Sequence, residues 1–222
     1  MTQPSIVFFD MDHTVVDIDC DLSWKYFLAD EGLAPVSHCE KADEFLRLYH
    51  NGAIKTDEFV RFQLREFVGH SQEEMQALSQ RHFDTRICDH IYPQAFREIE
   101  SHRRNGPFIA LLTGTSRIIA EPMAMWLGMS DLLATEPEII DKRFTGNIIE
   151  PFLMNEGKVK RAIEYCQLKQ KSLSDAAYYA DSITDVPLLT KVGQAIVVNP
   201  KNQDLLGLAQ SRRWRIERWS LS

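Results

Sequence analysis

The chain has no apolar run long enough to cross a membrane and no excess of basic residues. Its 222 residues carry 25 lysines and arginines against 32 aspartates and glutamates, a formal net charge of −7. Nucleic-acid-binding domains usually carry a basic surface, so we expect no nucleic-acid partner. A bilayer span needs about 20 apolar residues, and a signal peptide starts with a basic and then an apolar segment. Neither pattern is present, so we expect no membrane partner.

Cysteine is also scarce. Cys20, Cys39, Cys88 and Cys166 are scattered, without the spacing of a metal site or a redox motif. Unpaired thiols are typical of the reducing cytoplasm. We therefore expect a cytoplasmic protein without disulfides, whose oligomeric state the composition leaves open.

The most informative segment is an apolar run, residues 6–9, followed by Asp10 and Asp12. Such a run predicts a buried strand of a parallel sheet, and ligands of open α/β sheets bind beyond the carboxyl ends of these strands. Two carboxylates placed there repel each other and lose hydration. The pattern therefore predicts a bound metal ion.

Two later apolar runs also end in polar residues. The run at residues 110–112 precedes Thr113 and Gly114, and the run at residues 177–180 precedes Asp181, with Asp185 close behind. Between them, Lys158 stands in the first turn of a predicted helix, where the helix dipole disfavours a cation. A phosphate bound between the lysine and the helix N-terminus would remove this conflict.

Between residues 17 and 90 the strand signals give way to helical ones. We expect Asp21 to cap a helix that ends near Gly32, and two amphipathic helices to end near Gly52 and Gly69. A capping box at residues 71–74 begins a fourth helix. These helices form an insertion after the first strand.

After residue 90, strands and helices alternate. The sequence predicts an α/β fold: a Rossmann-like parallel sheet with helices on both faces, built from residues 1–16 and 91–222, plus an α-helical cap domain at residues 17–90. Strands are expected near residues 108–112, 132–134, 143–149, 176–180, 195–198 and 214–217, and helices near 93–105, 118–127, 156–167 and 186–190. The helix at 156–167 is expected to bury Val159, Ala162, Ile163 and Cys166.

The order of these motifs carries a family resemblance. Asp10-x-Asp12-x-Thr14, then Thr113, Lys158, and Asp181 with Asp185 follow one another as in the haloacid dehalogenase-like hydrolases. A cap between the first two motifs is similar to that of the phosphoserine-phosphatase-like branch. The resemblance covers nearly the whole chain.

The resemblance implies a role for each motif. Asp10 would be a nucleophile that forms an aspartyl-phosphate, Asp12 the general acid and base, and Thr113, Gly114 and Lys158 the groups that bind the phosphoryl group. It also implies Mg²⁺, held by Asp10, the backbone carbonyl of Asp12 and Asp181, with Asp185 orienting Lys158 or a metal-bound water.

The implied activity is a Mg²⁺-dependent phosphomonoesterase acting on a small metabolite. Asp19 falls where phosphoserine phosphatases read the substrate amine with a glutamate, and Asp21 is an equal candidate. Phe67 stands where they often carry an arginine for the substrate carboxylate, with Arg65 nearby. An amine-bearing substrate such as phosphoserine or histidinol phosphate is expected; phosphotransfer to an acceptor alcohol and a non-catalytic phosphate-binding or signalling protein are the alternatives.

Overall fold

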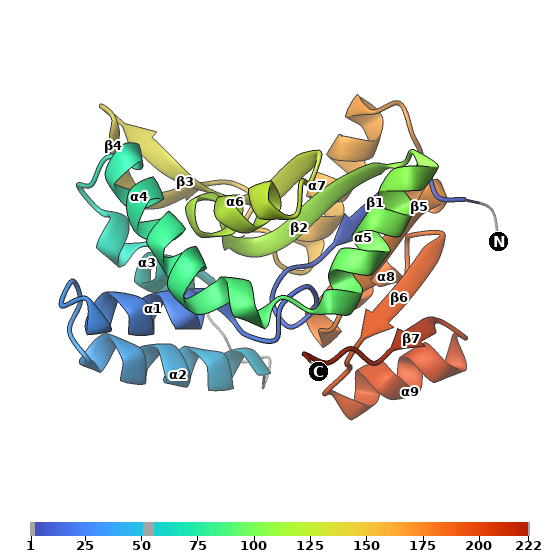
Figure 1. Ribbon diagram of the computed structural model, residues 1–222, viewed down its shortest axis with the longest axis horizontal. Helices are drawn as coiled ribbons and strands as arrows, with labels where there is room; N and C mark the ends of the chain where they lie inside the picture. The colour runs from blue at the N-terminus through green and yellow to red at the C-terminus, as the bar shows by residue number, and fades with distance from the viewer. Residues whose placement is uncertain (1–2, 51–55, 222) are drawn as a thin grey trace.

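The computed structural model describes residues 3–50 and 56–221, and its centre is a seven-stranded sheet (Figure 1). The strand order is β4-β3-β2-β1-β5-β6-β7, so the first strand lies in the middle. The strands are β1 (Ile6–Phe9), β2 (Phe108–Ser116), β3 (Asp131–Ile140), β4 (Arg143–Ile149), β5 (Ala176–Ala180), β6 (Gln194–Val198) and β7 (Arg215–Glu217).

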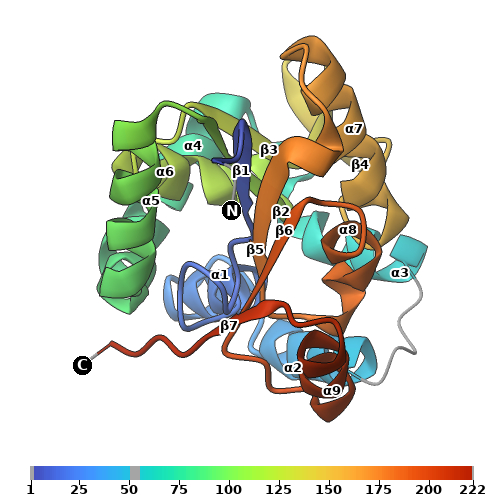
Figure 2. The ribbon, with the colours of Figure 1, turned by 90° about the vertical axis from the view of Figure 1, so that its right-hand side faces the viewer.

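Helices cover both faces of the sheet (Figure 2). Helices α5 (Pro93–Asn105) and α6 (Arg117–Trp126) lie on one face, and α7 (Glu156–Leu168) and α8 (Val186–Leu189) on the other. Alternate residues of β1 serve the two faces: Val7 and Phe9 join one hydrophobic cluster, Ile6 and Phe8 the other. Helix α9 (Gln203–Ser211) adds Leu205 and Ala209 to the second cluster.

The predicted α/β fold is confirmed, with one correction to the sheet. β1 pairs in parallel with β2 and β5, and β2–β3, β5–β6 and β6–β7 are also parallel. β4 runs antiparallel to β3. The reason is local: Asp141 and Lys142 both have positive φ, as in the two-residue turns that join antiparallel strands.

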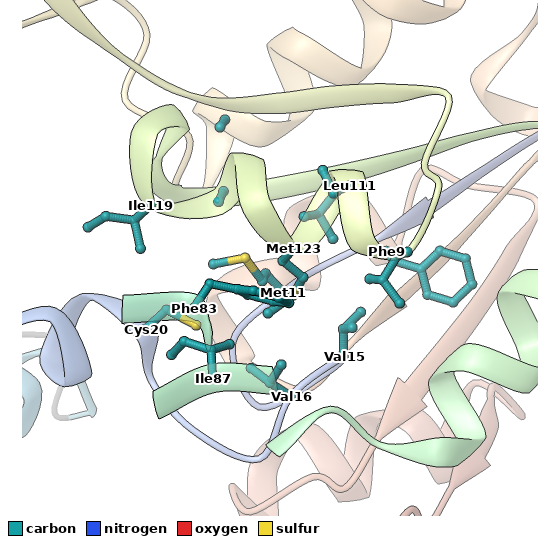
Figure 3. Close-up of a cluster of buried hydrophobic side chains, with 14 of the residues drawn as sticks. Phe9, Met11, Val15, Val16, Cys20, Phe83, Ile87, Leu111, Ile119 and Met123 are labelled. Atoms are coloured by element: carbon teal, nitrogen blue, oxygen red, sulfur yellow. The ribbon is translucent and has the colours of Figure 1, made fainter. Parts of the chain in front are cut away.

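The predicted helical insertion lies between β1 and α5. It contains α1 (Cys20–Asp30), α2 (Ser37–His50), α3 (Thr56–Gln63), the short turn η1 (Arg65–Phe67), and α4 (Gln72–His82), followed by the turns η2 (Phe83–Ile87) and η3 (Cys88–His90). Side chains of α1 and η2, such as Cys20 and Phe83, pack with Met11 of the β1 end and Met123 of α6 in one cluster (Figure 3). The division into a core domain and a cap domain stays a prediction.

The insertion differs from expectation at the start of α1. Asp19, not Asp21, is the N-cap, because its carboxylate accepts the backbone N–H of Leu22 at 2.8 Å. The capping box of Ser71 and Glu74 is confirmed. The predicted stop at Gly52 lies outside the described residues.

In the remainder of the chain, two details are informative. Pro93 begins α5 and Gly106 ends it with φ 87°, as predicted. Ile163 is 39% exposed, so its predicted burial on α7 is wrong, because its position on the helix faces solvent.

The described cysteines are all unpaired. Within residues 3–50 and 56–221, no helix combines the length and apolarity of a membrane span.

Pro122 lies inside α6, although a proline in a helix interior usually breaks or kinks the helix. A proline has no N–H, so the carbonyl four residues earlier, that of Ile118, loses its helical partner. The hydroxyl of Ser79, from α4, donates to this carbonyl at 2.6 Å. Since Ser79 is fully buried, this bond ties the insertion to the core without water.

We expect Ser79→Ala to lower the free energy of unfolding by about 1–3 kcal/mol, because it leaves the buried Ile118 carbonyl unsatisfied. In a Pro122→Ala background, the restored N–H can bond that carbonyl, so the cost of Ser79→Ala falls below about 1 kcal/mol. Urea unfolding of the four chains of this double-mutant cycle measures both values. Equal costs in the two backgrounds would contradict the assignment.

Candidate active site

The site lies beyond the carboxyl ends of β1, β2 and β5, in the middle of the sheet. β2 and β5 lie on opposite sides of β1, so the connections that follow these strands turn away from each other. Such a point in an open α/β sheet leaves a cavity beyond the carboxyl ends of the strands. Residues that line this cavity include Asp10, Asp12, Asp19, Gly114, Lys158 and Asp181. The structure thus brings together most of the residues that the sequence selected from five separate segments.

Lys158 is the centre of the buried part of the site. It is only 6% exposed, and its Nζ donates to Asp10 Oδ1 at 2.7 Å, Asp185 Oδ1 at 2.8 Å and the Tyr178 hydroxyl at 3.2 Å. Burial by itself would lower its pKa, but the carboxylates of Asp10 and Asp185 hold the pKa well above the usual lysine value. Lys158 is therefore a buried cation held by two acids.

The local chain explains how Lys158 reaches this place. Helix α7 begins at Glu156 after Asn155, which has φ 50°. A Cβ on Gly157 would lie 1.9 Å from the carbonyl oxygen of Phe152. Only glycine permits this close approach, which winds the preceding loop tightly against the helix start and directs Lys158 inward.

The acids of the site crowd one another. Burial raises the pKa of Asp10 to about 7, with Lys158 opposing the shift and Asp185 and Asp12 adding to it. Burial also raises the pKa of Asp181 well above normal, and Asp10 and Asp185 raise it further. Carboxylate oxygens of Asp10, Asp181 and Asp185 lie within 4.8 Å of one another. This charge density calls for a cation in addition to Lys158.

Asp12 is held by different partners. Its Oδ1 accepts the backbone N–H of Cys20 at 2.7 Å, and its Oδ2 accepts the Thr115 hydroxyl at 2.8 Å. Thr113 Oγ1 lies 3.5 Å from the same Oδ2 and accepts the backbone N–H of Thr115 at 3.1 Å. These donors turn the Asp12 side chain toward β2 and the start of α1.

Some predicted positions differ from expectation. Thr113 is fully buried and is not among the residues that line the cavity, whereas Gly114 and Thr115 are. Asp19 lines the cavity but also caps α1; burial, with Asp12 adding to the effect, raises its pKa to about 7. Asp185 is 2% exposed and contacts Lys158 directly.

Two residues of the site, Thr115 and Tyr178, are not predicted from the sequence. Thr115 contacts Asp12, and Tyr178 donates to Asp185 Oδ1 at 2.6 Å. Period-two alternation along β2 offered a signal for Thr115, since it shares a strand face with Thr113. A fully buried tyrosine needs a hydrogen-bond partner, but nothing in the sequence connects Tyr178 with Asp185.

Comparison with known proteins agrees with this arrangement. Residues 7–190 match the family described as haloacid dehalogenase-like hydrolase. The chain belongs to that family. The resemblance predicted from the sequence motifs is thereby confirmed.

Among the similar proteins, a histidinol-phosphatase of Neisseria meningitidis is 29% identical over 96% of this chain and 97% of its own length. Phosphoserine phosphatase SerB1 of Mycobacterium tuberculosis is 32% identical over 67% of this chain, which spans only 48% of that relative. A solved protein of unknown function from Bordetella pertussis is 31% identical over the whole of both chains, with a TM-score of 0.90.

A solved phospho-aspartyl intermediate analogue of phosphoserine phosphatase shares the fold. Its TM-score is 0.71 over 98% of this chain and 94% of that one, at 16% identity. This likeness shows a shared fold over the matched length.

Lys158→Met tests the electrostatics of the site in metal-free buffer. Removing the ammonium leaves buried carboxylates unpaired, so we expect a loss of about 3–5 kcal/mol in the free energy of unfolding at pH 7.5. The folded-state pKa of Asp10 is already raised, to about 7, and without Lys158 it rises further. A raised carboxyl pKa stabilises the fold at low pH and loses that effect as pH rises, so the loss should shrink toward pH 5.

Chemical denaturation with a chelator, between pH 5 and pH 8, measures this dependence. Lys160→Met is the matched control, because Lys160 is an exposed lysine two residues further along α7. A deficit of Lys158→Met that does not change with pH would contradict the explanation.

Proposed function

We propose that this protein is a Mg²⁺-dependent phosphomonoesterase that hydrolyses a small phosphorylated metabolite through an aspartyl-phosphate on Asp10. The observation that carries the proposal is the buried cluster in which Lys158 lies between Asp10 and Asp185, beside Asp181, at one cavity. The relatives named as phosphatases support the same reaction class.

Asp10 is the proposed nucleophile. It lines the cavity at the end of β1, and Lys158 fixes its Oδ1 while Thr14 Oγ1 lies 3.5 Å from its Oδ2. Attack of one carboxylate oxygen on phosphorus forms the acyl phosphate and breaks the ester bond. The same lysine can balance the negative charge that a bound phosphoryl group brings.

Asp12 is the proposed general acid and base. It would protonate the leaving alcohol and then take a proton from the water that attacks the acyl phosphate. The bonds from Cys20 and Thr115 fix its carboxyl group. Gly114 lines the proposed phosphoryl pocket, and a Cβ there would lie 3.2 Å from the Leu153 carbonyl oxygen, so the close approach favours glycine. Thr113 lies behind the cavity wall and accepts the backbone N–H of Thr115, so its proposed role in phosphoryl binding is to position this part of the wall.

The residues present fit a Mg²⁺ ion. Besides the three clustered carboxylates, Asp185 Oδ2 is a buried oxygen without a hydrogen-bond partner among the described residues. The side chains of Asp10 and Asp181 and the backbone carbonyl of Asp12 would hold the ion, with Asp185 beside them. When bound, Mg²⁺ supplies positive charge that offsets the charge of a phosphoryl group.

The helical insertion also has a proposed role in the reaction. Residues 17–90 would act as a cap domain over a core of residues 1–16 and 91–222, and would exclude bulk water from the cavity. Asp19 at the cavity wall supports an amine-bearing substrate such as histidinol phosphate or phosphoserine. We place the reaction in the cytoplasm, where the unpaired cysteines stay reduced.

The decisive experiment measures release of inorganic phosphate from p-nitrophenyl phosphate. We expect turnover with Mg²⁺, loss of turnover on chelation, and a fall of at least about 1,000-fold in Asp10→Asn, because an amide cannot serve as the nucleophile.

Glu73→Gln, an exposed change on α4, serves as the control. Phosphate appearing on an added alcohol would indicate a phosphotransferase, and a stable phosphoprotein a signalling protein. Full activity under chelation would refute the metal-dependent mechanism.

Tyr178→Phe tests how Lys158 and Asp185 are positioned. The hydroxyl donates to Asp185 and accepts from Lys158, so its removal should lower kcat by about tenfold, which corresponds to ~1.4 kcal/mol, with a smaller change in KM. Tyr179→Phe is the matched control, since that hydroxyl donates to Glu98 at 2.8 Å, away from the cavity. Equal effects of the two variants on kcat would argue against a positioning role.

A further inference from the structure

Two lysines line the active-site cavity, and their environments differ. Lys158 is 6% exposed and is paired with Asp10 and Asp185. Lys201, from the connection between β6 and α9, is exposed to solvent. A side chain that both lines a cavity and contacts solvent lies where the cavity opens. Lys201 therefore stands at the cavity entrance, on the side formed by the core.

The backbone on both sides of Lys201 is anchored by side chains. Asn199, with φ 44°, donates from Nδ2 to the Trp219 carbonyl at 3.0 Å and accepts the Trp219 N–H on Oδ1 at 2.8 Å. The side chain of Asn202 accepts two N–H groups of the first turn of α9 at 2.8 and 3.0 Å. These bonds fix the main chain that carries Lys201, so binding an anion there orders only the lysine side chain.

The ammonium group of Lys201 has a histidine beside it. Its Nζ lies 3.4 Å from Nδ1 of His13, which also lines the cavity. An ammonium group has only donors, so Nδ1 is the acceptor in this contact. No carboxylate within residues 3–50 and 56–221 forms an ion pair with Lys201. Its positive charge is thus not balanced by an acid, in contrast to that of Lys158.

The remaining charges of the cavity repel an anion. A phosphate monoester carries close to two negative charges at neutral pH, and the charge of Lys158 is already shared by two carboxylates. A bound Mg²⁺ would offset two of the acids, but the chain as a whole still has a formal charge of −7. Charges at a cleft entrance change the rate at which a charged ligand associates. The aspartates that line the cavity are Asp10, Asp12, Asp19, Asp21 and Asp181.

We propose that Lys201, held by His13, is an anion-binding position at the cavity entrance that captures the phosphate dianion of the substrate and binds the phosphate product on its way out. This inference rests on the proposed phosphatase activity and adds to it a residue outside the catalytic cluster. Lys201 attracts and positions the dianion and takes no part in bond breaking. Its removal therefore affects kcat/KM and phosphate affinity more than kcat.

Lys201→Met tests the proposal with p-nitrophenyl phosphate, whose only ionised group is the phosphate. At about 0.01 M salt we expect kcat/KM to fall roughly three- to tenfold, the effect of one exposed charge near a dianion, with kcat almost unchanged. Salt screens such an attraction. The difference from the unaltered chain should therefore shrink at about 1 M salt, where the Debye length is about 3 Å.

Two further variants separate a local effect from a change in net charge. Lys191→Met removes the same charge from an exposed lysine that does not line the cavity, so it should leave kcat/KM almost unaltered. Lys201→Arg keeps the charge and should retain most of the activity. Equal losses in Lys201→Met and Lys191→Met would overturn the proposal.

A second substrate distinguishes two sources of the captured anion. In 4-carboxyphenyl phosphate, a carboxylate replaces the nitro group of p-nitrophenyl phosphate. Capture of the phosphate predicts a similar fall in kcat/KM for both substrates in Lys201→Met. A fall confined to 4-carboxyphenyl phosphate would mean that Lys201 recognises the alcohol portion, and it would overturn the proposal.

Phosphate binding separates this inference from the phosphatase on which it rests. Isothermal titration calorimetry with inorganic phosphate needs no turnover, and we expect the Kd to rise roughly three- to tenfold in Lys201→Met but not in Lys191→Met. This difference without turnover of any phosphate ester would refute the phosphatase and keep the anion-binding position. Turnover with the same phosphate affinity in all three chains would refute the anion-binding position alone.

Discussion

The structure depends on one buried cation surrounded by carboxylates. Lys158 pairs with Asp10 from the start of the chain and Asp185 from its last third, at 2.7 and 2.8 Å. A buried charge without a partner costs several kcal/mol, so the strands that carry these acids and the helix that carries the lysine must meet at one edge of the sheet. The ion pairs constrain the sheet order as well as the site.

The same edge governs how the inserted helices begin. The Asp12 carboxylate binds the first N–H of α1 through Cys20, so an acid of the strand end is also the attachment point of the insertion. On the other side, Ser79 satisfies the carbonyl that Pro122 leaves free. These two bonds couple the α1 and α4 helices to the core, and the hydrophobic cluster of Figure 3 fills the space between them.

The cavity has two ends of different character. Near the strand ends, buried acids and Lys158 create a site for a phosphoryl group and a cation. Toward the insertion, apolar side chains such as Leu46 and Phe59 line the cavity together with the carboxylate of Asp19.

The sequence by itself determined the sheet strands, the insertion and the identities of the acids and the lysine, because apolar runs ending in polar residues are local patterns. It also located the capping box at Ser71 and the helix from Pro93 to Asn105. Tertiary structure alone decided that Tyr178 contacts Asp185, that Thr115 contacts Asp12, and that Ser79 pairs with Ile118. Those choices rest on contacts between residues up to 103 positions apart, and no local spacing encodes such contacts.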